Sequence, residues 1–292
     1  MYNILGMAFQ RNFYGDQYVF IDGTEIKGVQ SFDGSWTIPR SNMLAAGYEY
    51  VGSEIEGTLE GEVSISRLIV ESSDPITGHL GSEINGELVY GPNQSTSKSF
   101  YFDKGFVNSY SSSCSIGEVA TSDFGITAYG SVGSTQSNNS KKNNVSYNAI
   151  TPKISTANSM TLTTSFGSTN AIQSYDLSLN LDLKPIYKMG DMFIPSKFEI
   201  VTPIIISTNF QIFTSDYEIE DLYHSICSSN FVENLNISLN EKCNGPEIRS
   251  FTLDNAELVG SSISAGIGDN LSISLDFENK FDDISTLVST VF

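Results

Sequence analysis

The sequence predicts a mainly β protein made of two tandem β-sandwich or β-barrel domains. Its 18 Phe and 14 Tyr residues favour strands, together with many Ile and Val, whereas strong helix formers are scarce. Apolar and polar residues alternate with a period of two, which is typical of strands with one buried face. Several motifs of the first half also recur in the second half, which indicates a duplicated domain.

The acidic composition excludes several classes of function. The chain has 15 Lys and Arg against 34 Asp and Glu, a formal net charge of −19. Specific nucleic-acid binding is not expected, because it depends on cationic side chains that displace counterions from phosphates.

No run of about 18 apolar residues occurs, so no membrane-spanning helix is expected. Three scattered cysteines, Cys114, Cys227 and Cys243, are interpreted as reduced structural thiols.

Three short motifs carry the internal repeat. The matching pairs are Val29–Asp33 with Ile172–Asp176, Ser99–Asp103 with Ser250–Asp254, and Ile116–Glu118 with Ile267–Asp269. The first pair is offset by 143 residues (172 − 29), whereas the other two share an offset of 151 (250 − 99). An insertion of about eight residues in the second half explains the difference. The alternative is chance similarity between strands of like composition.

A polar segment separates the two halves. Ser131–Val145 has almost no large apolar residue and is predicted to be a linker. We therefore expect a first domain at 1–140, with its core at about 20–130, and a second at 141–292, with its core at about 150–282.

The first unit is expected to contain a long hairpin. On its outgoing strand Gln30, Phe32, Trp36 and Ile38 share one face. The return strand is expected over Glu54–Ile65, where apolar side chains alternate with a row of polar ones. That polar row consists of Glu54, Glu56, Thr58, Glu60 and Glu62.

The second unit repeats this pattern. From Ile172 to Lys184, Leu residues alternate with polar ones, and the face of Gln173 and Tyr175 is expected to be buried. The chain is expected to return over Pro195–Phe213, and a closing strand is expected over Leu271–Glu278. Between them, the spacing of apolar residues and the early acidic residues predict a helix over Asp216–Cys227. The corresponding region of the first unit, Ser72–Gly81, is expected to be a loop.

No motif in the sequence points to catalysis. His79 and His224 are the only histidines, and neither has the context of a catalytic triad. No metal-ligand, Walker or dinucleotide motif occurs, so we expect no catalytic residue, no metal and no cofactor. The carboxylates of Glu54–Glu62 could in principle serve a glycosidase, but their regular repetition is typical of a surface. We expect that the protein is not an enzyme.

The order of these features resembles the bacteriophage tail tube family. The features are the Gln-Ser-Phe/Tyr-Asp strand, the long hairpin, the helix and the Ser-Phe-x-Phe/Leu-Asp block. The segment Phe251–Phe277 is similar to the terminal segment of those proteins, and related domains occur in type VI secretion tubes and baseplate hubs. The resemblance is strongest over 150–282 and weaker over 25–130. It implies a tail-tube-like sandwich or barrel in each unit, with one flanking helix in the second.

The resemblance implies a virion structural protein that is assembled in the host cytoplasm and located in the tail. Its rings would stack into a conduit through which genomic DNA passes without specific binding. The implied partners are further copies of the chain, the tape measure, terminator and baseplate proteins, and a sheath if the tail contracts. The acidic residues expected to face the lumen are Asp33, Glu54, Glu56, Glu60, Glu62, Asp176 and Asp182. The alternative is that these acids solvate an outer face.

Two further functions stay open at the level of sequence. One is a tube-like hub of the baseplate or tail tip, and the other is a β-sandwich adhesin or carbohydrate-binding module. Since tube rings of this family contain six domains, two domains per chain imply a trimer. The alternative is a hexamer in which one domain of each chain lines the lumen.

Overall fold

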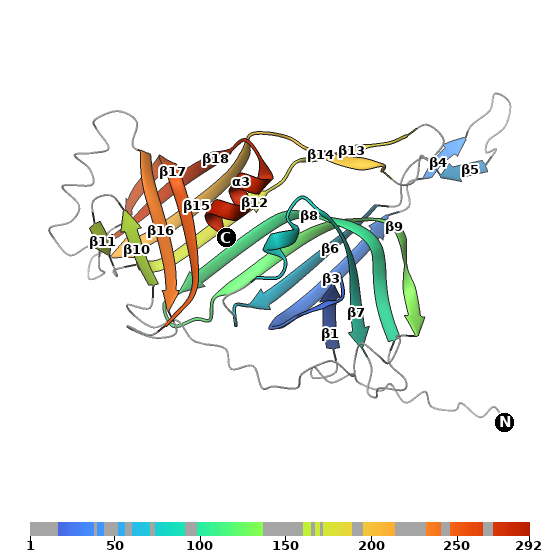
Figure 1. Ribbon diagram of the computed structural model, residues 1–292, viewed down its shortest axis with the longest axis horizontal. Helices are drawn as coiled ribbons and strands as arrows, with labels where there is room; N and C mark the ends of the chain where they lie inside the picture. Colours follow the sequence, from blue (N-terminus) through green and yellow to red (C-terminus); the bar gives the residue numbers. More distant parts are fainter. Residues whose placement is uncertain are drawn as a thin grey trace.

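The computed structural model describes thirteen segments of the chain. They are residues 17–37, 40–43, 52–55, 60–70, 74–90, 98–136, 160–164, 167–169, 172–188, 195–213, 232–240, 246–264 and 271–292. Most of these residues form a single antiparallel sheet of 14 strands (Figure 1). The expectation of a mainly β protein is confirmed.

The strands of the first half follow one another in the sheet in the order β2-β1-β7-β8-β9-β6-β3. Their bounds are β1 Gln17–Ile21, β2 Thr24–Ile26, β3 Val29–Thr37, β6 Glu60–Leu68, β7 Glu83–Tyr90, β8 Lys98–Ser115 and β9 Thr121–Gln136. Strand β9 extends to Gln136, so the first residues of the expected linker belong to the sheet.

The second half repeats this order strand by strand, as β11-β10-β16-β17-β18-β15-β12. Its bounds are β10 Met160–Thr164, β11 Gly167–Thr169, β12 Ile172–Asn180, β15 Ile204–Phe213, β16 Val232–Asn240, β17 Glu247–Ser264 and β18 Ser272–Phe281. The repeated motifs occupy equivalent strands, because Phe32 on β3 pairs with β6 as Tyr175 on β12 pairs with β15. We call the two strand sets unit 1 and unit 2.

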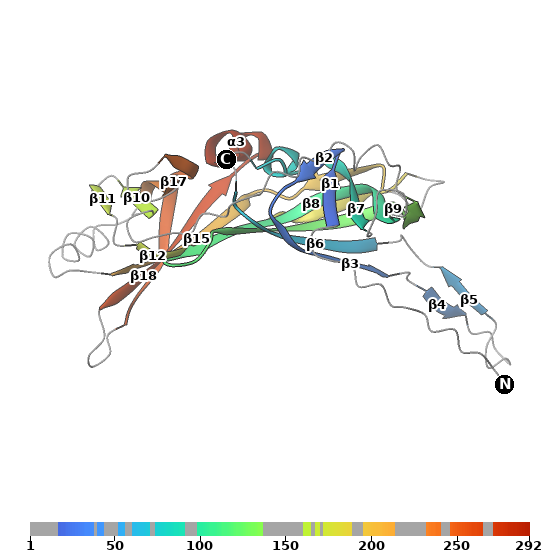
Figure 2. The same cartoon turned by 90° about the horizontal axis from the view of Figure 1, so that it is seen from below.

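Each unit also carries a two-stranded arm beyond its hairpin. Arm 1 consists of β4 (Arg40–Met43) and β5 (Gly52–Ile55), and arm 2 of β13 (Leu183–Ile186) and β14 (Lys197–Ile200). The return strand expected over Glu54–Ile65 begins in β5 and ends in β6, and residues 56–59 between them lie outside the described residues. In Figures 1 and 2, arm 1 projects from the end of the sheet, whereas arm 2 runs along unit 1.

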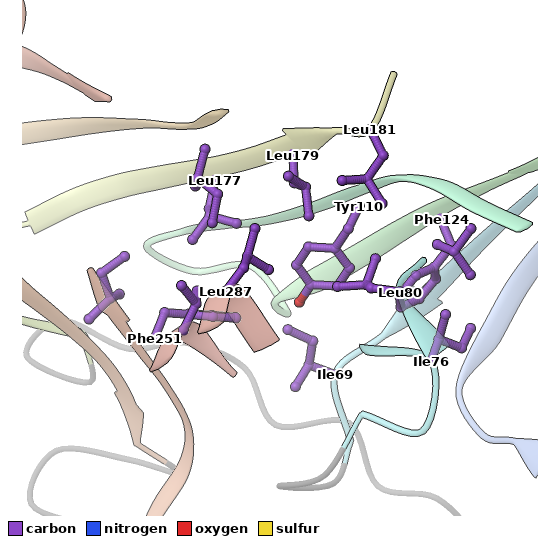
Figure 3. Close-up of a cluster of buried hydrophobic side chains, with 14 of the residues drawn as sticks. Ile69, Ile76, Leu80, Tyr110, Phe124, Leu177, Leu179, Leu181, Phe251 and Leu287 are labelled. Atoms are coloured by element: carbon purple, nitrogen blue, oxygen red, sulfur yellow. The ribbon is translucent and has the colours of Figure 1, made fainter. Parts of the chain in front are cut away.

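The two units are joined by the edges of two strands. The first part of β8 pairs with β7, and its last part, Ser109–Ser115, pairs with β12. Across this joint, the hydroxyl groups of Ser112 and Tyr175 are 2.9 Å apart and share a hydrogen bond. The joint is covered by a shared core (Figure 3), in which Tyr110 of unit 1 lies beside Leu179 of unit 2.

One α-helix occurs in the described residues, α3 (Ile284–Val291). Asp283 caps its N-terminus, since its Oδ1 accepts a hydrogen bond of 2.8 Å from the backbone N–H of Thr286. Leu287 and Val291 pack into the core. Figure 2 shows the sheet as an arch with α3, β1 and β2 on its convex side. The helix expected over Asp216–Cys227 lies outside the described residues.

Two expectations about side chains need correction. Ile172 is buried in place of Gln173, because a β-bulge between Ile172 and Ser174 shifts the alternation. Phe32 is only partly buried, whereas its counterpart Tyr175 is 2% exposed. The difference arises because β3 is at the end of the sheet and β12 is inside it. The region Ser72–Gly81, expected to be a loop, contains a short 3-10 helix at Thr77–His79.

A buried ion pair stabilises unit 1. Arg67 Nη2 lies 3.5 Å from Asp74 Oδ2, and both side chains are almost inaccessible to water. Arg67 Nε also donates a hydrogen bond of 3.2 Å to Ser122 Oγ. A buried charge without its partner is strongly destabilising.

We therefore expect Asp74→Ala to lower the free energy of unfolding by about 3–5 kcal/mol. The control is Glu83→Ala, which removes the exposed partner of Lys104 and is expected to cost about 1 kcal/mol or less. Urea unfolding measures both. Equal, small losses would contradict the role given to the buried pair.

Candidate functional site

On the concave side of the arch, whose shape Figure 2 shows, most side chains of both units are polar, with Ile205 an exposed apolar residue among them. We call this surface the polar face. It alternates with the buried residues that pack toward α3, so its side chains point away from the core. Six carboxylates stand on it among Ser, Thr and Asn, namely Asp33, Glu62, Asp123, Asp176, Asp276 and Glu278. Eight strand segments form this face, and none of them contains Lys or Arg. They are residues 29–37, 62–66, 121–127, 109–115, 174–180, 205–211, 272–278 and 260–264.

Most of these carboxylates have neutral neighbours in the sheet, whereas Glu278 is opposite Glu257. Asp33 is opposite Ser64, and Asp176 has Ser113 on one side and Asn209 on the other. Asn209 donates hydrogen bonds from Nδ2 to Asp276 and, at 2.8 Å, to Ser274 Oγ. Lys280, the next residue on this side of β18, pairs with Glu257 and lies close enough to Glu278 for their charges to interact. The strand segments of the face itself contribute no cation, so the face stays negative and repels other anions.

Two of the acids meet at the joint between the units. Asp176 is on β12 and Asp123 is on β9, on either side of β8. Partial burial raises the pKa of Asp176 above its usual value, and the nearby charge of Asp123 raises it further.

A hollow of about 420 Å³ opens on the same face in unit 1. Asp33, Glu62, Asn108 and Gly125 contribute to its lining. Across the described segments, no group of three His, Cys, Asp or Glu side chains is placed to hold a metal ion. His79 lies elsewhere, with Nδ1 3.4 Å from Asp22 Oδ2.

The residues expected to face a lumen are only partly placed by the structure. Asp33, Glu62 and Asp176 are exposed on the polar face, and Asp182 is exposed directly after β12. Glu54 is in β5 and Glu60 begins β6, but their side chains, and the whole of Glu56, lie outside what the structure describes. Asp123, Asp276 and Glu278 join the face as additional acids. Period-two alternation over Thr121–Thr127 and Ser272–Glu278 is the signal that could have identified them.

Several strand edges of the sheet lack a partner among the described residues, including those of β2 and β11, and two of them bear on assembly. Strand β3 pairs only with β6, and Gly260–Ser264 of β17 pairs only with β18. Their counterparts in the other unit, β12 and Ser109–Ser115 of β8, pair with each other at the joint. Each of the two kinds of edge thus occurs twice in the chain, once paired at the joint and once without a partner among the described residues.

The surface of unit 1 that contacts arm 2 differs from the equivalent surface of unit 2. In unit 1, Phe198 of arm 2 packs on Phe106 and Tyr129, with ring centroids 4.1 and 4.8 Å apart. The equivalent positions of unit 2, at the offset of 151, are Glu257 and Lys280. They form an exposed ion pair with a distance of 2.7 Å between Lys280 Nζ and Glu257 Oε2.

No protein-family model and no curated protein matches this chain. In the described part of the chain, no helix is long and apolar enough to cross a membrane.

The pair at the joint allows a test by titration. Because the folded-state pKa of Asp176 is raised, folding favours its protonated form, and its contribution to stability falls as the pH rises through that pKa. We expect Asp123→Asn to lower the pKa of Asp176 and to reduce this fall. Carboxyl NMR titration and unfolding at several pH values measure the two effects. The control Asp33→Asn, on a strand separated from β12 by three others, should leave the pKa of Asp176 unchanged. An unaltered pKa in Asp123→Asn would contradict the coupling.

Proposed function

We propose that the chain is a virion structural protein, a tail tube subunit whose stacked rings form the conduit for genome ejection. The observation that carries this proposal is the pair of free edges. Within the chain, β8 of unit 1 joins β12 of unit 2, and the equivalent edges are left free at β17 and β3. A head-to-tail contact of this kind repeats from copy to copy and forms a ring when its rotation closes.

The arms support the same arrangement. Arm 2 lies on unit 1 of its own chain through Phe198. Arm 1 projects beyond the sheet (Figure 2), where unit 2 of a neighbouring copy would lie. Six equivalent units would make a ring of three chains, whereas a hexamer would need one unit of each chain to leave the lumen. The shared polar face of both units favours the trimer.

The charge of the polar face suits a DNA conduit. In a closed ring the concave side of the arch becomes the inner wall, and its carboxylates repel the phosphates of DNA. A wall with few cations avoids most of the counterion release that makes DNA adhere to basic surfaces. The genome would thus slide without binding.

Charge reversal on the wall tests the conduit. We expect particles with Glu62→Lys, Asp123→Lys and Asp176→Lys, all on strands inside the sheet, to assemble but to eject DNA several-fold more slowly at low salt, with recovery at high salt. The matched control places three lysines at exposed acids outside the face, Glu118, Glu247 and Asp282. Ejection kinetics measured by dye release compare the two variants. Equal ejection rates would count against a lumenal position of the face.

A further inference from the structure

We infer that β3 of one copy pairs in antiparallel fashion with Gly260–Ser264 of β17 of the next copy, with Ser35 opposite Ser262. This contact rests on the proposed assembly into rings and specifies the surface that closes them. Its partner is a second copy of this chain, because each chain presents both halves of the contact.

The joint inside the chain supplies the register. There, Ser111 on β8 is opposite Ser178 on β12. The repeat offsets of 151 and 143 carry this pair to Ser262 and Ser35. The same offsets place Ile263 opposite Gly34, where the internal joint has Ser112 opposite Leu177.

The side chains on the two free edges differ from their equivalents at the internal joint, and they differ in the same sense on both edges. Inside the chain, the hydroxyl groups of Tyr175 and Ser112 share a buried hydrogen bond. Their equivalents on the free edges are Phe32 and Ile263, which can form only an apolar contact. Both sides of the contact thus exchange a polar group for an apolar one, as expected if they meet each other.

The exposure of Ile263 indicates that a further chain packs on this edge. Ile263 is 51% exposed although it follows the alternation of the buried face, since it pairs with buried Ile273 on β18. Across the proposed contact, the indole ring of Trp36 lies over Gly34, so closely that a Cβ on this glycine would be 2.6 Å from the ring. Ile263 would pack against that ring.

The backbone gives a second reason. An edge strand presents unpaired N–H and C=O groups, and natural proteins usually protect such edges with Lys, Pro or a bulge on the strand. Strand β3 has no Lys and no Pro, and its only irregularity is near its start, between Val29 and Ser31. Pairing with β17 of the next copy would satisfy these groups.

Cysteine cross-linking tests the register. Directly opposite residues of antiparallel strands have Cα atoms about 4.5–5.5 Å apart, within the range of a disulfide. We expect the double variant Ser35→Cys with Ser262→Cys to form, under mild oxidation, covalent oligomers that a reductant dissolves. The matched control Ser111→Cys with Ser178→Cys should form its disulfide within one chain. The unmodified protein, oxidised in the same way, shows any cross-links that the three native cysteines form.

The outcomes separate this inference from the proposed function. Oligomers linked through positions 35 and 262 support both. Rings or tubes in electron micrographs without that cross-link, while the control disulfide forms, would overturn the inference and leave the tube proposal standing. A chain that stays monomeric by sedimentation would overturn both.

A second variant avoids dependence on oxidation. We expect Ile263→Asp to weaken self-association about tenfold or more, because a charge would be buried against Trp36. The control Ile205→Asp changes an exposed residue of β15, which is paired on both sides, and should leave association unchanged. Analytical ultracentrifugation measures both. Equal association of the two variants would contradict the contact.

Discussion

The pairing of strand edges is the constraint on which this structure depends. A sheet of 14 strands would leave long rows of unpaired backbone groups at its ends. One such edge is satisfied inside the chain, where Ser109–Ser115 of β8 pairs with β12. The joint fixes how unit 2 follows unit 1, keeps the polar face continuous, and brings Tyr110 and Leu179 into one core (Figure 3).

The two units have the same topology, but different side chains fill the same part of their cores. On β3 and β6, Trp36 spreads its ring over Gly34 and Gly61. The equivalent positions of β12 and β15 are Leu179, Leu177 and Ile206, which are buried. One large ring and two glycines thus replace three branched side chains. This packing explains Gly34 and Gly61, which would weaken a strand by themselves.

The sequence allowed the fold class, the repeat and much of the polar face to be predicted, because period-two alternation and short motifs are local signals. Asp33, Glu62 and Asp176 were identified from that alternation. It could not reveal the bulge at Ile172 and Ser174, which depends on pairing with β15. The junction of Asp123 with Asp176 and the free edge at Ile263 depend on which strands become neighbours, and that is a tertiary property.

The central claim is that the joint between the units is repeated between copies until a ring closes. Symmetry analysis of electron micrographs of the assembled protein tests it most directly. The account predicts rings of three chains, in which six units alternate around one continuous sheet with the polar face inward. Six chains in one ring, or a ring whose sheet is broken at β3 and β17, would contradict it.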